Sequence, residues 1–155
     1  MEKSGVTMQK EAFKDCMSES TALLNAHWEE CAGWKDKIKL NVDEARYIAA
    51  ESNGVGHCFT MREDGRLIGY MVILLAPHIH YKDDKFAYVD VLFMDKERRK
   101  GLSAVKFMKW VESEVKRMGA AVMTYHIKTF HDYPAIFERL GFSKVEVNYA
   151  KCLKE

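Results

Sequence analysis

The sequence predicts an α/β (α+β) fold, with a mixed, mostly antiparallel central sheet flanked by helices on both faces. Two amphipathic helical segments come first, a long apolar hairpin follows, and strand–helix crossovers complete the chain. A hairpin joins antiparallel strands, whereas a strand–helix–strand crossover joins parallel ones, so a mixed sheet follows. The chain has 155 residues and no low-complexity stretch, and we expect residues 1–155 to form a single domain.

The first half of the chain is predicted to hold two helices and a hairpin. Apolar residues recur at three- and four-residue steps over 9–31 and over 42–52, which is the spacing of one helical face. Strands are expected at 57–62 and 67–76, because Glu63-Asp64-Gly65-Arg66 between them has turn-forming chemistry.

The second half is predicted to alternate between strands and helices after a polar loop at 78–85. Gly119 and Gly141 are natural helix stops, and Pro134 suits a first helical turn. The expected elements are a strand at 86–94, a helix at 102–118, a strand at 121–127, a helix at 133–140 and one or two closing strands within 142–153.

Composition argues against several functional classes. The net charge of +1 gives no support to a nucleic-acid binder, and the longest apolar run, 70–77, is too short to span a membrane. The N-terminus lacks the apolar core of a signal peptide, so a soluble cytoplasmic protein is expected. Cys16, Cys31, Cys58 and Cys152 show neither CxxC nor zinc-ligand spacing, so we expect reduced, mostly buried thiols and no metal.

The strongest functional signal is a strand that runs through a basic loop into a helix, ending in Arg98-Arg99-Lys100-Gly101-Leu102-Ser103. A helix N-terminus offers unpaired N–H groups and the positive end of a dipole, which suit a pyrophosphate. Gly101 lets the backbone approach phosphate oxygens, Ser103 adds a hydroxyl, and the three cations supply charge. The residues alone leave open that the run is only a solvated turn.

This loop resembles the acetyl-CoA-binding motif of the GNAT N-acetyltransferase family, Gln/Arg-x-x-Gly-x-Gly/Ala, with Ser103 at the last position. The segment 134–142, PAIFERLGF, resembles the family's helix-to-strand signature, and 63–70 resembles its second and third strands. The resemblance spans roughly residues 10–153, and the His-x-His-Tyr stretch at 78–81 is reminiscent of small phage-encoded members.

The resemblance implies that acetyl-CoA is the donor and that a primary amine attacks the thioester directly, in a ternary complex. It further implies that the pantetheine arm pairs with a strand edge, and that a backbone N–H near Phe93 or Met94 polarises the thioester carbonyl. Phe137 stands where relatives often have a Tyr that donates a proton to the departing thiolate. The implied donor-binding residues are Leu92, Phe93, Met94, Arg98, Arg99, Lys100, Gly101, Leu102, Ser103 and Phe137.

The acceptor side has weaker candidates. Asp90 is a carboxylate in an apolar strand and is expected to hold or deprotonate the amine. Tyr133, one helical turn before Phe137, is the candidate acid, with Tyr125 and His126 as rivals. The predicted acceptor-binding residues are Trp34, His78, His80 and Asp90.

Alternatives remain open at this point. The same fold could serve as a non-catalytic CoA-binding or protein-interaction module, and the two histidines could be ordinary surface residues. Neither the identity of the acceptor nor the oligomeric state follows from the sequence, and a homodimer is possible.

Overall fold

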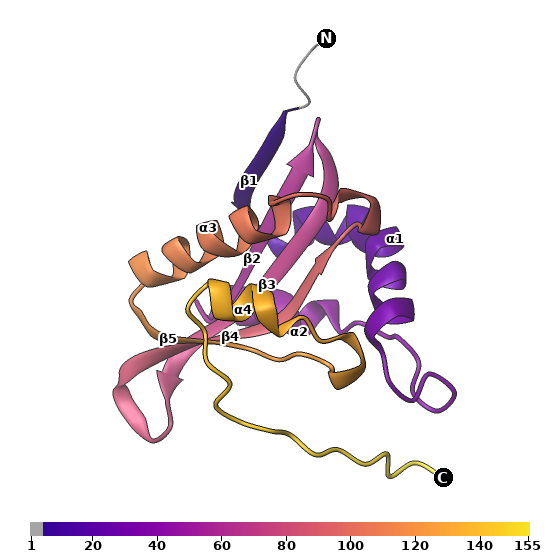
Figure 1. Cartoon of the computed structure of the whole chain (residues 1–155). Coiled ribbons are helices and arrows are strands. Elements are labelled where there is room, and N and C mark those ends of the chain that lie inside the picture. The colour runs from indigo at the N-terminus through magenta and orange to yellow at the C-terminus, as the bar shows by residue number, and fades with distance from the viewer. Residues whose placement is uncertain (1–4) are drawn as a thin grey trace.

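The computed structural model describes residues 5–155 and contains one sheet whose strands lie in chain order (Figure 1). Neighbouring strands are antiparallel except for the last pair, which is parallel. The predicted mixed, mostly antiparallel sheet is therefore confirmed. Its strands are β1 (Val6–Glu11), β2 (Gly56–Glu63), β3 (Arg66–His78), β4 (Tyr81–Met94) and β5 (Ala120–Tyr125).

Helices cover both faces of the sheet, as predicted (Figure 1). One face carries α1 (Phe13–Cys31) and α2 (Glu44–Ser52). The other carries α3 (Ser103–Arg117) and α4 (Pro134–Arg139). Two short 3₁₀ helices complete the fold, η1 (Lys96–Arg98) before α3 and η2 (Thr129–His131) before α4.

The larger part of the hydrophobic core lies between the sheet and α3. Apolar residues recur along α3 at helical spacing, so one side of the helix is buried against the strands while the other stays polar. A smaller cluster lies beneath α1 and α2 on the opposite face. The buried residues of α3 are Phe107, Met108, Val111 and Val115.

The first predicted helix begins four residues too early. Residues 9–11 belong to β1, which pairs with β2 in the register Val6↔Glu63 to Glu11↔Cys58. The strand is short and lies at the edge of the sheet, so its side chains carry little apolar periodicity. Its geometry is fixed instead by a charged contact that lies 51 residues away in sequence, from Glu11 to Arg62.

Two further predictions are wrong. The segment 78–85 is not a loop, because β3 and β4 form a hairpin whose last pair is His78↔Tyr81. The closing strands within 142–153 do not form, and residues 142–155 are irregular. This segment leaves α4 and runs away from the sheet (Figure 1), so it finds no edge to pair with, although its end meets Lys37, whose Nζ donates to the Lys154 carbonyl at 3.1 Å.

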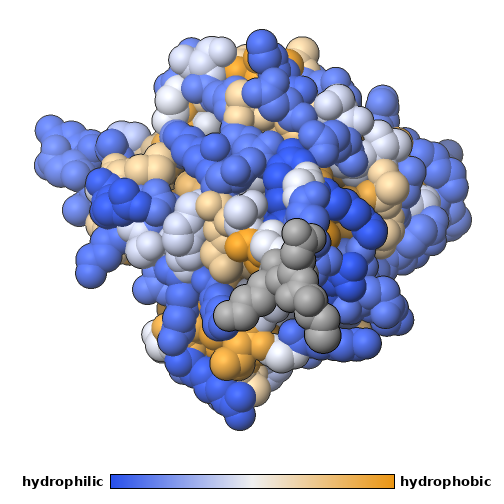
Figure 2. Space-filling model, turned by 90° about the horizontal axis from the view of Figure 1, so that it is seen from above, coloured by the Kyte–Doolittle hydropathy of each residue, from blue (hydrophilic) through white to orange (hydrophobic). Residues whose placement is uncertain are grey.

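The surface is largely polar on the face shown in Figure 2, where hydrophobic residues gather in separate smaller areas. Among residues 5–155, no helix combines the length and apolar character that a membrane crossing requires. The four cysteines are free thiols, as expected, although only Cys16 and Cys58 are fully buried.

A paired guanidinium ties β1 to β2 and α1. Arg62 Nε lies 2.7 Å from Glu11 Oε1, its Nη2 lies 2.9 Å from Glu11 Oε2, and its Nη1 lies 2.8 Å from Glu19 Oε2. The side chains of Arg62 and Glu11 are only 11% and 10% exposed. The hydrogen bonds from Arg62 lower the pKa of Glu11 to about 2, so the carboxylate contributes stability that is lost as the pH falls from about 4.5 towards 2.

We expect Arg62→Ala to destabilise the fold by about 3 kcal/mol, because it leaves the Glu11 carboxylate without its cation in a largely buried position. Arg66→Ala is the matched control, since Arg66 is 69% exposed and pairs with Asp95 at 3.1 Å. Its loss should cost less than about 1 kcal/mol. Urea denaturation at pH 7 measures both values, and similar losses for the two variants would contradict this account.

Candidate active site

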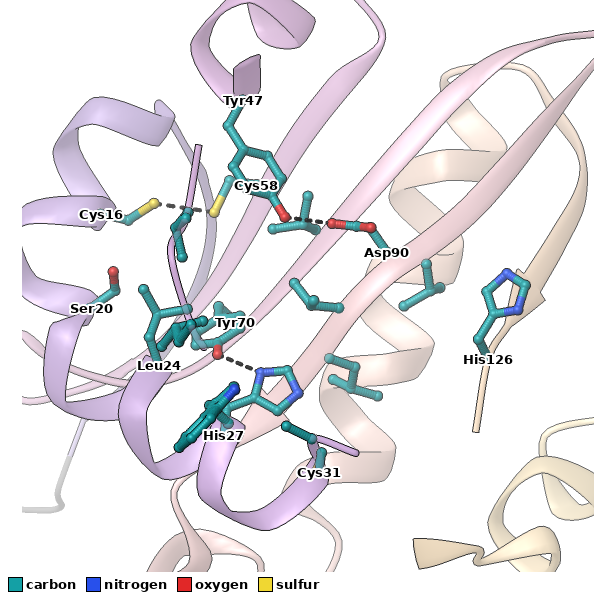
Figure 3. A pocket seen from close by; sticks show the side chains of 18 of the residues that line it. Cys16, Ser20, Leu24, His27, Cys31, Tyr47, Cys58, Tyr70, Asp90 and His126 are labelled. Carbon is teal, nitrogen blue, oxygen red and sulfur yellow. Dashed lines mark hydrogen bonds between the residues drawn. The ribbon is translucent and has the colours of Figure 1, made fainter. Parts of the chain in front are cut away.

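A pocket of about 450 Å³ lies on the side of the sheet covered by α1 and α2 (Figure 3). It is bounded by these helices, by β4, and by the segment that follows β5. Most of the side chains around it are apolar, with a few polar groups among them. The apolar residues include Phe13, Met17, Leu24, Trp28, Leu40, Val42, Val72, Val91 and Leu92.

The pocket lies where β4 and β5 part. The parallel pairing between them extends from Lys85↔Ala120 to Val89↔Tyr125 and then stops. Within the described chain, residues 91–94 pair only with β3. One edge of the last part of β4 is therefore left with unpaired backbone groups beside the pocket.

A bulge in β4 marks this point. Val72 pairs with Val91 and the next residue of β3, Ile73, pairs with Val89, so Asp90 is the extra residue. Its carboxylate accepts a hydrogen bond of 2.6 Å from the Tyr47 hydroxyl of α2, and both residues line the pocket (Figure 3). Burial raises the pKa of Tyr47, and the contact with Asp90 raises it further. Tyr47 therefore stays protonated and can only donate to this carboxylate near neutral pH.

A second polar pair lies across the pocket. His27 Nδ1 and the Tyr70 hydroxyl are 2.7 Å apart, and the His27 ring stacks on Phe93 with centroids 4.7 Å apart (Figure 3). Burial lowers the pKa of His27 to about 4 and raises that of Tyr70. Both groups are neutral at physiological pH, which makes His27 a weak base and a good packing partner.

Arg99 is folded inward and braces the loop after β4. Its guanidinium binds both carboxylate oxygens of Glu30, its Nε donates to the Met94 carbonyl at 2.9 Å, and it lies 4.9 Å from the Phe93 ring centre. His131 Nε2 lies 2.8 Å from Glu30 Oε1. The Arg99 hydrogen bonds hold the pKa of Glu30 below its usual value. This network ties the end of α1 to η2 and to the basic loop.

Glu30 and His131 also form, with Cys31, a group whose possible ligand atoms lie within 4.8 Å of one another. Metal ions favour such mixed sets. However, both Glu30 oxygens bind Arg99, and a dication would have to displace or adjoin that guanidinium. The geometry therefore fits an ion-pair network better than a metal site.

The basic loop has the predicted strand–turn–helix order. Gly101 has φ +72°, a conformation that L-residues with a Cβ disfavour, and α3 begins two residues later. Arg98 pairs with Glu63 at 2.7 Å, so it and Arg99 are engaged within the protein. Over residues 5–155, Lys100 is the cation of this motif that forms no ion pair, and it is exposed.

Tyr133 and Phe137 share a face of α4, as their spacing predicted, with ring centroids 6.2 Å apart. Tyr133 lines the pocket, and burial raises its pKa. Phe137 instead packs into the core against Tyr125, 5.0 Å away, and Phe142. Tyr125 also lines the pocket, but its hydroxyl faces the Met71 sulfur at 3.9 Å. His126 lines the pocket from the segment after β5 (Figure 3).

Three predicted acceptor residues lie elsewhere. His78 and His80 lie at the tip of the β3–β4 hairpin, beyond the pocket, where the His78 ring contacts Phe86 at 4.4 Å. The sequence predicts them near the site because they cluster at the end of the third strand, but the paired strands of the hairpin carry them beyond the pocket. Trp34 follows α1 and does not line the pocket, while Trp28 does.

Comparison with known proteins decides the family. The model of the "Acetyltransferase (GNAT) family" matches residues 16–142, most of the chain. The chain belongs to the GNAT acetyltransferase family. It is thus an acyltransferase enzyme that carries out acetyl transfer. No curated protein sequence matches significantly.

Several solved structures have a fold similar to that of this GNAT acetyltransferase. An aminoglycoside acetyltransferase from an uncultured soil metagenomic sample, in complex with sisomicin, has TM-score 0.74 and 14% identity over 96% of this chain and 97% of its own. Glucosamine-6-phosphate N-acetyltransferase from Arabidopsis thaliana has TM-score 0.72 and 13% identity over 97% of this chain and 99% of its own. A predicted acetyltransferase with acetyl-CoA from Clostridium acetobutylicum has TM-score 0.67 and 15% identity over 96% and 97%.

Several site residues of the GNAT acetyltransferase could not be found from its sequence. Four of them stand out only through partners distant in sequence: Tyr47, Tyr70, Glu30 and His131. Glu30 and its partner Arg99, for example, are 69 positions apart. No local spacing marks such pairs. The bulge at Asp90 was visible in the sequence only as a carboxylate inside an apolar strand.

We expect the buried neutral His27 to make stability depend on pH. Between pH 6.5 and about 4 the unfolded chain binds a proton at this residue and the native protein does not, so stability falls as the pH falls. His27→Gln removes this dependence. The free energy of unfolding of the variant, relative to that of the parent, should therefore rise by about 2 kcal/mol when the pH is lowered from 7.5 to 4.5.

Urea denaturation at both pH values measures this difference. A constant difference between His27→Gln and the parent at the two pH values would show that His27 is not held neutral.

Proposed function

We propose that this acetyltransferase uses acetyl-CoA as its donor, bound along the open edge of β4 and the loop from Arg98 to Ser103, and acetylates an amine beside Asp90. The observation that carries the proposal is the parting of β4 from β5 after Val89↔Tyr125. It leaves a strand edge free next to a basic loop and a helix start. An amide-containing arm can add to such an edge as a further strand.

The direction of the backbone groups supports particular contacts. The Met94 carbonyl accepts from Arg99, and the Asp95 N–H donates to the Ile68 carbonyl of β3 at 2.7 Å. The backbone N–H and C=O groups of successive residues point to opposite sides of a strand. Those of Leu92 and Met94 therefore point to the open edge, while those of Phe93 point to β3. We therefore assign arm pairing and polarisation of the thioester carbonyl to the N–H groups of Leu92 and Met94 rather than to that of Phe93.

The loop fits a pyrophosphate through its backbone. An ideal Cβ on Gly101 would meet no atom within 4 Å, so the space before α3 is open. The first N–H groups of this 15-residue helix have no partner inside the helix, and the residue before it, Leu102, forms no side-chain cap. Because Arg98 and Arg99 are held by carboxylates, Lys100 supplies the free charge, and Arg99 serves to hold the loop in shape.

Asp90 and Tyr133 are the residues proposed to transfer protons. When bound, acetyl-CoA supplies an activated acetyl group as a thioester. Asp90, held by Tyr47, binds the acceptor ammonium and helps it lose a proton. The amine nitrogen then forms a bond to the carbonyl carbon as the carbon–sulfur bond breaks. Of the two protons that the ammonium loses overall, one leaves to solvent and one reaches the sulfur, for which Tyr133 is the proposed donor.

Tyr133 is favoured over Tyr125 by its surroundings. Burial raises its pKa, which keeps the hydroxyl protonated at neutral pH, and its ring lies at the pocket. The Tyr125 hydroxyl is turned towards Met71, and Phe137 has no proton to give.

Gly101→Glu tests the donor site. The substitution strains the loop at φ +72° and adds bulk and negative charge in the open space before α3. We expect acetyl-CoA affinity to fall at least about 30-fold, more than 2 kcal/mol. Gly101→Ala is the control, because it adds the strain without the charge. Calorimetric titration with CoA measures both, and unchanged affinity in a folded Gly101→Glu variant would rule out this site.

Tyr133→Phe tests the acid. Loss of a general acid typically lowers the rate by about 10²–10⁴-fold. We expect such a fall in kcat, with melting temperature and CoA affinity unchanged, because the hydroxyl forms no internal hydrogen bond among the described residues. Tyr81→Phe, on the hairpin tip, is the control. A kcat within twofold of the parent would remove Tyr133 from the mechanism and leave Tyr125, His126 or solvent as the proton source.

A further inference from the structure

The pocket beside Asp90 has an uneven distribution of polarity. The wall formed by α1 presents Phe13, Met17, Leu24 and Trp28 to the cavity. Charged groups are few and lie towards other elements. Among the described residues that line the pocket, the carboxylates are Asp90 and Glu44, and Lys128 is a cation.

Several polar atoms on the α1 wall have partners inside the protein. His27 bonds Tyr70, the Ser20 hydroxyl donates to the Met17 carbonyl at 2.9 Å, and the sulfurs of Cys16 and Cys58 are 3.2 Å apart. Buried thiols behave as small apolar groups. Since these groups need nothing from a ligand, the wall favours an apolar surface against it.

The position of Asp90 completes the pattern. The bulge places one carboxylate at the end of the open β4 edge, where it is oriented by Tyr47. The other carboxylate that lines the pocket, Glu44, is exposed at the start of α2, and Glu30 is bound on both oxygens by Arg99 and does not line the pocket. Only a limited negative charge therefore faces the cavity.

From this arrangement we infer that the acceptor is a small monoamine with an apolar body, such as an alkylamine or an arylalkylamine. Its body lies against α1 and its nitrogen beside Asp90. This inference rests on the proposed function, because it takes the reacting amine to lie at Asp90. The cavity of about 450 Å³ must hold this acceptor together with the end of the pantetheine arm along β4, which favours a small acceptor.

The same features disfavour polycations such as aminoglycosides and polyamines. Each further ammonium would lose its water against an apolar wall, and burying an ion without a partner is strongly unfavourable. Lys128 would add repulsion. The similarity in fold to an aminoglycoside enzyme therefore does not extend to the acceptor.

The test is a homologous series of amines assayed with acetyl-CoA, from propylamine to hexylamine, together with 1,6-diaminohexane, spermidine and kanamycin. Burial of each methylene should raise kcat/KM about threefold to fourfold until the cavity is full. Hexylamine and 1,6-diaminohexane differ by one terminal ammonium. We expect at least a 30-fold preference for hexylamine.

Variants link this preference to the pocket. Leu24→Asn should lower kcat/KM for hexylamine about tenfold and flatten the chain-length series. Leu23→Asn is the matched control on the same helix, since Leu23 is also half-buried but does not line the pocket. Asp90→Asn should lower kcat/KM for every amine while calorimetric affinity for CoA is kept.

The outcomes separate the two proposals. Rising activity along the series that is flattened only by Leu24→Asn supports the inference. Equal or better turnover of 1,6-diaminohexane, spermidine or kanamycin overturns the monoamine acceptor and leaves the proposed function standing. A protein that binds CoA but acetylates none of these amines overturns the assignment of the amine site at Asp90, and the monoamine acceptor with it.

Discussion

The parting of two parallel strands is the constraint on which the rest of the site depends. β4 follows β5 only as far as Val89, and beyond it the backbone of β4 is open on one side. An open edge inside a protein is unfavourable unless something satisfies its polar groups. In this fold the neighbouring strand is replaced by space, and the bulge at Asp90 bends β4 where that space begins. A fully paired β5 would make a more regular sheet and would remove the site.

Holding the strands apart requires bracing, which charged residues provide. Arg99 binds Glu30, the Met94 carbonyl and the face of Phe93, and so connects α1 with the last residues of β4. The guanidinium thereby fixes the loop that leads into α3. One of the three cations that the sequence offers to phosphate thus has a structural role. Removing it would leave Glu30 beside His131 with no guanidinium, so its effect on donor binding would be indirect.

Much of the fold followed from periodicity, because α1, α3 and the β2–β3 hairpin each bury an apolar face, whereas α2 contributes only the half-buried Tyr47. Periodicity failed where contacts and not local pattern decide the structure. β1 is held by the Glu11–Arg62 pair, and the strand-like alternation of Val145 and Val147 leads to no strand because no edge lies beside it. The site shows the same division. Gly101 and Asp90 carry local signals, whereas Tyr47 and His27 acquire meaning only from partners 43 residues away.

The polarity of the pocket also bears on the chemistry, since an amine reacts only after losing a proton. Apolar walls lower the pKa of a bound ammonium, because desolvation disfavours the charged form. In the proposed mechanism the Asp90 carboxylate acts in the opposite direction on this pKa, but it is also the base that helps the ammonium lose its proton. Asp90 is exposed on its strand and accepts a hydrogen bond from the Tyr47 hydroxyl. The proposed mechanism needs an exposed, hydrogen-bonded carboxylate at the end of an apolar cavity, which binds the cation and still releases the neutral amine, because a dry, unshared ion pair would do this poorly.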